Sequence, residues 1–163
     1  RSPGLLPTII SALAETGLDP ARFEIEITEG VLLHESEANM AVLHRMRDLG
    51  IKVALDDFGT GYSSMDYLRR LPVDELKLDK SFVERITLTE NDRSIVELMV
   101  RIAHTFGLEV VAEGVEDVAT ETVLREMGCD RAQGYLYAPA MSVEQFIVWW
   151  VSRQDVLLSA PAP

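Results

Sequence analysis

The chain has 163 residues, of which 47% are apolar, and it carries 15 Lys and Arg against 27 Asp and Glu, a formal net charge of −12. This length and apolar fraction indicate one globular domain and exclude a disordered tail or a fibrous repeat. The acidic charge argues against DNA or RNA as a partner, because nucleic-acid binding needs a basic surface. It is compatible with a small phosphorylated ligand held through a metal ion.

Two further features of the composition predict a cytoplasmic domain. The longest purely apolar run, Phe146 to Val151, is far shorter than the roughly 20 residues that a membrane span needs, so this segment is expected to make no membrane contact. The single cysteine, Cys129, excludes an intrachain disulfide and is typical of a reducing compartment.

Helix-like and strand-like segments alternate along the chain, which predicts βαβ units and a parallel sheet. In chain order, the expected elements are a helix at 5–13, strands at 23–27 and 51–55, a helix at 65–71, a strand at 76–78, a helix at 95–106, strands at 108–112 and from about 131, and a helix at 142–153. Ser142 and Gln145 are placed as a capping box for the closing helix, with Trp149 and Trp150 as its packing residues. Residues 155–163 are expected to form a flexible tail.

Two segments, Gly50 to Asp56 and Gly107 to Glu113, repeat each other. In both, a carboxylate follows the glycine by six residues, just past an apolar stretch. Equal offsets place Asp56 and Glu113 at one height, at the C-terminal ends of their strands, where ligands bind in open α/β sheets and in α/β barrels. The alternative is that each acidic residue only caps the following helix.

The spacing of the strands leaves two alternatives for the architecture. The strand starts are about 27 residues apart, so 163 residues supply five or six βα units, whereas a (β/α)8 barrel takes roughly 250 residues. The chain is therefore either a smaller open sheet or part of a barrel.

Polar residues at the expected strand ends are candidates for chemistry. Glu26 shares the polar face of an alternating strand, and it is either a residue on the wet face of an edge strand or a metal ligand. The adjacent Asp56 and Asp57, with Gly59 and Gly61 in a pliable loop after them, suit one or two hard cations.

Further polar residues follow on the next strands. Lys77 and Asp79 lie two apart on one strand face, and Lys77 is either a structural counter-ion or the group that orients and deprotonates a water. Glu113 and Glu116 follow another strand. Gln133 ends the last strand, where an amide can hold a ligand or a side chain.

Taken together, these segments resemble the EAL-domain family of cyclic di-GMP phosphodiesterases. The resemblance extends from about residue 5 to 153 and rests on five motifs: Glu26-Ile27-Thr28-Glu29, Asp56 to Ser64, Lys77 to Phe82, Glu113-Gly114-Val115-Glu116 and Gln133-Gly134-Tyr135. It implies a (β/α)8 TIM-type barrel with the active site at the C-terminal ends of the strands. Residues 1–154 would then be a partial EAL domain, from about the third strand to the last helix.

The resemblance also implies an activity and a role for each motif residue. The activity is hydrolysis of cyclic di-GMP to linear pGpG by a metal-activated water, with Mg²⁺ or Mn²⁺ as cofactor and Ca²⁺ as inhibitor. The implied metal ligands are Glu26, Asp56, Asp57 and Glu113, and the implied catalytic residues are Lys77, Glu113 and Asp57. The implied substrate-binding residues are Glu116, Gln133 and Asp79. Glu29 would brace the loop that contains Gly59, Thr60 and Gly61, which in this family links dimerisation to metal binding.

The chain departs from the family pattern in three places. No Glu-Ala-Leu segment precedes Glu26, the asparagine ligand of the family's second strand is absent, and Ala138-Pro139-Ala140 stands where a cation is usual. The first strands are therefore expected to be missing, and this chain alone is expected to be inactive. A homodimer or strand-swapped oligomer, upstream regulatory domains and a location in the cytoplasmic part of a membrane-anchored protein are further expectations. The alternative function is an inactive EAL-type receptor for cyclic di-GMP.

Overall fold

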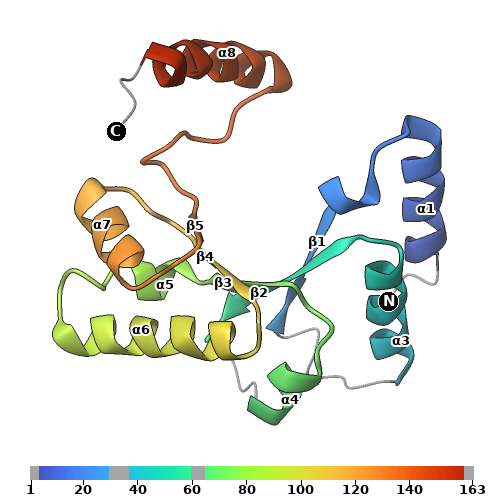
Figure 1. Ribbon diagram of the computed structural model, residues 1–163, viewed down its shortest axis with the longest axis horizontal. Helices are drawn as coiled ribbons and strands as arrows, with labels where there is room; N and C mark the ends of the chain where they lie inside the picture. The colour runs from blue at the N-terminus through green and yellow to red at the C-terminus, as the bar shows by residue number, and fades with distance from the viewer. Residues whose placement is uncertain (1–3, 30–36, 60–64, 160–163) are drawn as a thin grey trace.

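The computed structural model describes residues 4–29, 37–59 and 65–159 (Figure 1). Five parallel strands form one sheet in the order of the chain. They are β1 (Glu24–Thr28), β2 (Lys52–Phe58), β3 (Glu75–Leu78), β4 (Glu109–Ala112) and β5 (Arg131–Ala132). All five strands were expected from the sequence, and the sequential parallel order confirms the βαβ prediction and gives a partial α/β barrel.

Helices connect the strands and flank the sheet, α1 and α3 beside β1 and β2 and α5 to α7 beside β3 to β5 (Figure 1). They are α1 (Leu5–Thr16), the 3₁₀ turn η1 (Pro20–Arg22), α3 (Glu37–Asp48), α4 (Met65–Arg70), α5 (Lys80–Val83), α6 (Glu90–Thr105), α7 (Val118–Glu126) and α8 (Val143–Ser159). None of the helices in these described ranges is long and apolar enough to span a bilayer.

The hydrophobic core lies on one face of the sheet. Alternate strand residues, among them Val53, Leu55, Leu76 and Val110, are fully buried there together with apolar residues of the helices. Because side chains alternate along a strand, the residues between them point to the other face. That second face is polar, and it carries the candidate site.

The closing helix α8 begins at Val143, one residue after its expected start, and continues to Ser159, so the tail expected from 155 starts inside this helix. Its capping box is confirmed: Ser142 N donates to Gln145 Oε1 at 2.9 Å and Gln145 N donates to Ser142 Oγ at 3.3 Å. Trp149 and Trp150 lie against Phe146 on the same helix, and the side chain of Trp150 remains half exposed.

Candidate active site

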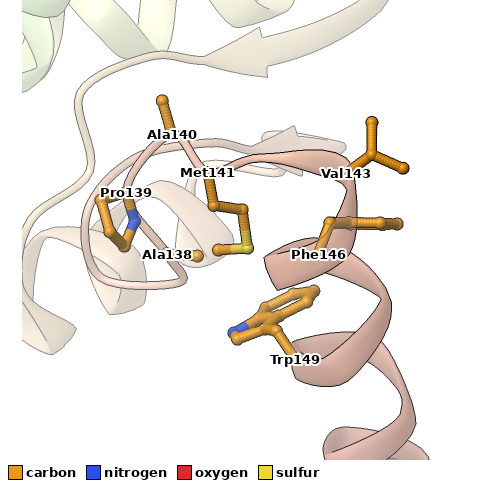
Figure 2. A pocket seen from close by; sticks show the side chains of 7 residues that line it. All are labelled: Ala138, Pro139, Ala140, Met141, Val143, Phe146 and Trp149. Carbon is orange, nitrogen blue, oxygen red and sulfur yellow. The ribbon is translucent and has the colours of Figure 1, made fainter.

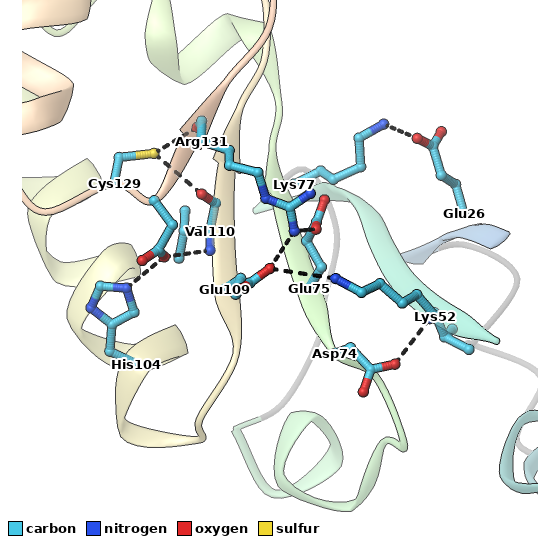
Figure 3. A network of polar contacts seen from close by, with 12 residues as sticks. Glu26, Lys52, Asp74, Glu75, Lys77, His104, Glu109, Val110, Cys129 and Arg131 are labelled. Carbon is cyan, nitrogen blue, oxygen red and sulfur yellow. Dashed lines mark hydrogen bonds and ion pairs between the residues drawn. The ribbon is translucent and has the colours of Figure 1, made fainter. Parts of the chain in front are cut away.

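The centre of the polar face is the ammonium group of Lys77, on β3. Its Nζ lies 2.6 Å from Glu26 Oε1 on β1, 2.6 Å from Glu113 Oε1 just after β4, and 3.4 Å from Asp56 Oδ1 on β2. The Lys77 side chain is only 5% exposed, and Figure 3 shows its ammonium group next to the carboxylate of Glu26, which lies two strands away. Four residues that the sequence placed at separate strand ends are therefore brought together.

The electrostatic surroundings of Lys77 keep it charged. Burial on its own lowers the pKa of this ammonium group, but hydrogen bonds to Glu113 and Glu26 and the charge of Asp56 outweigh burial and raise the pKa of Lys77 above its ordinary value. A lysine that holds its proton so firmly can orient a water molecule but is a poor acceptor for that water's proton. Lys77 is therefore a counter-ion of these carboxylates, and its firmly held proton argues against deprotonation of a water but not against orienting one.

The two aspartates lie within β2 rather than just past it. The register between β2 and β3 shifts between Leu55 and Phe58, which marks an irregularity at Asp56 and Asp57. Asp57 has a positive φ of 56°, a backbone conformation that is uncommon outside glycine and that often accompanies functional sites. Oδ1 of Asp56 is buried and makes no hydrogen bond to any described residue.

The segment after β4 and the segment after β5 lie directly against each other. Gln133 Nε2 donates to Glu113 Oε1 at 2.7 Å, and Val115 N donates to the carbonyl oxygen of Gln133 at 3.0 Å. A Cβ at Gly134 would stand 2.2 Å from the carbonyl oxygen of Val115, so only glycine permits this approach. Gln133 thus orients Glu113 toward Lys77.

The remaining expected site residues are placed less centrally. Asp79 caps α5 through a hydrogen bond from Ser81 N at 3.1 Å, and Glu116 is exposed. Glu29 is 3% exposed. Gly59 has a φ of +98° and leaves no room for a Cβ, which would lie 2.5 Å from Met99 Cε. Thr60 and Gly61 lie outside the described residues.

The comparison with known families decides what this fold is. A family model described as "EAL domain" matches residues 1–140. The chain belongs to the EAL domain family. A solved EAL-family neighbour is the phosphodiesterase MucR in complex with cyclic di-GMP. It superimposes with a TM-score of 0.83 at 37% identity, over 88% of this chain and 58% of that one. The partial barrel expected from the resemblance is thereby confirmed.

Curated relatives of this EAL chain are considerably longer than it is. The bifunctional diguanylate cyclase/cyclic di-GMP phosphodiesterase MucR of Pseudomonas aeruginosa is 37% identical over 144 residues, which cover 88% of this chain and 21% of MucR. The cyclic di-GMP phosphodiesterase NbdA of the same organism is 40% identical over 146 residues, which cover 88% of this chain and 19% of NbdA. The chain thus spans about a fifth of the length of these relatives.

A second solved neighbour of this EAL chain contains metal ions. BlrP1 of Klebsiella pneumoniae is 33% identical over 85% of the length of this chain. In a manganese/cyclic di-GMP complex it has a TM-score of 0.78, with 36% of the BlrP1 chain covered. In a calcium/cyclic di-GMP complex the TM-score is 0.77, with 35% covered. Divalent cations therefore occur together with cyclic di-GMP in a protein of this fold.

The residues of this EAL chain fit a divalent cation in their chemistry. The donors are carboxylate oxygens, which hard cations prefer, and the buried Oδ1 of Asp56 has an unused lone pair for such an ion. Within the described ranges, however, no three His, Cys, Asp or Glu side chains converge closely enough to hold a metal by themselves. The ammonium of Lys77 occupies the middle of the carboxylates instead.

A second polar cluster on the same sheet face was not predicted from the sequence. At the N-terminal ends of the strands, Arg131 of β5 bonds to the buried Glu75 of β3 and to Glu109 of β4, and Lys52 Nζ lies 3.9 Å from Glu109 Oε2 (Figure 3). The sequence did contain a signal for this cluster: each of these residues lies an even number of positions from a site residue on the same strand. Residues spaced in this way point to the same face of a sheet.

Two surface hollows lie away from Lys77. One, of about 430 Å³, is lined by apolar side chains of residues 138–149, including Phe146 and Trp149 (Figure 2). The other, of about 800 Å³, lies at the N-terminal ends of β2 to β4 and includes Arg47, Lys52 and Asp74. Neither contains the Lys77 cluster, so the shape of these hollows does not locate the chemistry.

Proposed function

We propose that this chain carries the carboxylate half of the active site of a cyclic di-GMP phosphodiesterase, which hydrolyses cyclic di-GMP to linear pGpG. The observation that carries the proposal is the convergence of Glu26, Asp56 and Glu113 on Lys77 at the C-terminal ends of parallel strands. Active sites of α/β barrels are built at this end of the strands. The named activities of MucR and NbdA support the same substrate.

The proposed reaction needs an attacking water and stabilisation of charge. Water attacks one phosphorus, the bond from phosphorus to the 3′ oxygen breaks, and this oxygen takes up the proton, which leaves pGpG with a 5′-phosphate. Mg²⁺ or Mn²⁺ bound by Glu26, Asp56, Asp57 and Glu113 would supply Lewis acidity and lower the pKa of the water. Lys77 orients the water through its fixed ammonium hydrogens, and Gln133 keeps Glu113 in place.

The other motif residues take supporting roles in this proposal. Glu116, Gln133 and Asp79 would contact the nucleotide, with exposed Glu116 free to reach a base. Glu29 and the segment from Gly59 through Thr60 and Gly61 would position the loop after β2. Ca²⁺, which is larger and more flexible in its coordination than Mg²⁺, would bind the same oxygens and inhibit.

A second candidate function is a cyclic di-GMP receptor that does not hydrolyse its ligand. It is favoured by one observation: Glu26, Asp56 and Glu113 face the ammonium group of Lys77, and no three side chains of the described residues form a ready metal site. For this chain by itself we therefore expect binding without turnover, and we assign hydrolysis to the longer protein.

Incubation with cyclic di-GMP and Mn²⁺, followed by chromatography of the nucleotides, tests which of the two functions this chain performs by itself. Complete absence of pGpG together with measurable binding favours the receptor function for this chain. Formation of pGpG that is lost in Glu113→Gln and retained in Glu109→Gln, a change at the opposite end of β4, favours hydrolysis. Formation of pGpG that is equal in both variants would contradict the assignment of the site.

We also propose a homodimer or strand-swapped oligomer and regulatory domains elsewhere in the longer protein. Support for self-association comes from the apolar side chains that α8 exposes: Val143, Phe146, Ile147, Val148, Trp150 and Val151. Light scattering during gel filtration would show a dimer for the wild-type chain and a monomer for the double change Ile147→Ser and Trp150→Ser. A monomeric wild-type chain would contradict the proposal.

A further inference from the structure

The charges around Lys77 do not balance. Three carboxylates from β1, β2 and the end of β4 face one ammonium group, and the ammonium is nearly inaccessible to solvent. Like charges that converge repel unless a cation lies between them, and here the repulsion is strongest for the mostly buried Asp56 and Glu113, because Glu26 is about half exposed. Lys77 is the cation that holds this arrangement together in the structure.

The geometry of the cluster resembles that of a coordinated ion. Nζ is in contact with one oxygen of Glu26 and one of Glu113, both at 2.6 Å, while Oδ1 of Asp56 stays at 3.4 Å without a hydrogen bond. A divalent cation placed among these oxygens would need to lie about 2.0–2.6 Å from each of them. The ammonium group and a divalent cation therefore compete for the same oxygens.

We propose that Lys77 is a built-in substitute for a divalent cation, which keeps Glu26, Asp56 and Glu113 assembled in the metal-free protein and gives up at least one of these carboxylates when an ion enters. Asp56, whose Oδ1 has no hydrogen bond to a described residue, is the carboxylate from which entry begins. That Lys77 keeps the carboxylates together without metal follows from the observed contacts alone. That an entering ion displaces Lys77 from a carboxylate rests on the metal site of the proposed function.

The exchange has a consequence for stability and for affinity. Without Lys77, the metal-free carboxylates lose their counter-ion, so the protein should unfold at lower denaturant concentration. An added ion would then meet no competitor, and because it binds the folded state it should restore stability. A purely structural lysine would cost the same stability with and without metal.

The test is urea unfolding of the wild-type chain, of Lys77→Met and of Lys52→Met, each in EDTA and in Mn²⁺, together with calorimetric titration of Mn²⁺. Lys52, half exposed and 3.9 Å from Glu109, is the matched control at the other end of the sheet. For Lys77→Met we expect a urea midpoint below that of the wild type in EDTA and a midpoint restored in Mn²⁺. We also expect this variant to bind Mn²⁺ about tenfold more tightly than the wild type. For Lys52→Met we expect neither a metal-dependent change in stability nor a change in Mn²⁺ affinity.

The outcomes separate the inference from the proposed function. If the wild type binds Mn²⁺ and Lys77→Met binds it equally or more weakly, the exchange is wrong while the metal site stands. If no variant binds Mn²⁺, both the exchange and the metal site are wrong. Should Lys77→Met be unfolded in EDTA, circular dichroism after addition of Mn²⁺ decides: recovered helix supports the inference, and an unchanged spectrum overturns it.

Discussion

Gly134 is a single residue that sets the geometry of the site. The backbone after β5 lies so close to Val115 that a methyl group at Gly134 has no place, and this close approach carries the Gln133 amide to Glu113. A change at Gly134 therefore acts on the polar cluster without touching any charged group in it.

We predict that Gly134→Ala lowers the free energy of unfolding by about 3 kcal/mol or more, because the added Cβ would meet backbone rather than a movable side chain. Gly107→Ala is the matched control: Gly107 has a φ of +74° and open space around its Cβ position, so the cost there is the conformational one of about 1–2 kcal/mol. Urea unfolding measures both. Equal losses in the two variants would show that the contact with Val115 is not restrictive.

The strand elements are linked at both ends of the sheet by charged side chains of one face. Lys77 joins β1, β2 and β4 at the C-terminal ends, and Arg131 joins β3, β4 and β5 at the N-terminal ends. β5 has only two residues in the sheet, and the contacts of Arg131 with Glu75 and Glu109 add to the backbone hydrogen bonds that join this segment to β4.

The carboxyl group of Glu75 makes this second link dependent on pH. Burial, and next the charge of Glu24, raise the pKa of Glu75 above its ordinary 4.5, although Arg131 opposes them. A carboxyl group whose pKa is raised by folding binds its proton more tightly in the folded state. Its contribution to stability is therefore full below about pH 4.5 and is lost as the pH rises through the raised pKa.

Glu75→Gln should remove this pH dependence. We predict that its free energy of unfolding improves relative to the wild type as the pH rises from about 4.5 and becomes constant once the pH is above the raised pKa. Urea unfolding at a series of pH values measures the difference, with Glu97→Gln, an exposed change on α6, as the surface control. A difference that does not change with pH would show that burial of Glu75 costs its charged form nothing.

The elements themselves were predicted well because their signals are local. The repeat of Gly50 to Asp56 at Gly107 to Glu113 placed both strands, and it placed the end of β4 correctly, whereas β2 continues past Asp56 to Phe58. Alternation placed Glu26 on the polar face. The irregularity at Asp57 and the pairing of Arg131 with Glu75, 56 positions apart, have no local signal, since they depend on how neighbouring strands meet. The contact of Asp79 with Ser81 is a local cap, and the role of Asp79 toward a nucleotide stays a prediction.

The sheet as a whole presents a polar surface with two charged layers above a hydrophobic core. The layer at the C-terminal ends contains the residues proposed for chemistry, and small side chains such as Ala54 separate it from the layer at the N-terminal ends. The net charge of −12, which the composition left open to interpretation, is concentrated in part around one lysine at the site. This arrangement suits a ligand whose phosphates are brought in by cations.

Calorimetric titration of cyclic di-GMP, in the presence of Mn²⁺, into the wild-type chain, Glu113→Gln and Glu109→Gln tests directly whether the Lys77 cluster receives this nucleotide. The two variants remove a carboxylate from opposite ends of β4, and only Glu113 belongs to the Lys77 cluster. We expect binding by the wild type and by Glu109→Gln, with affinity reduced about tenfold or more in Glu113→Gln. Equal binding by all three proteins, or no binding by the wild type, would contradict the claim that this cluster receives cyclic di-GMP.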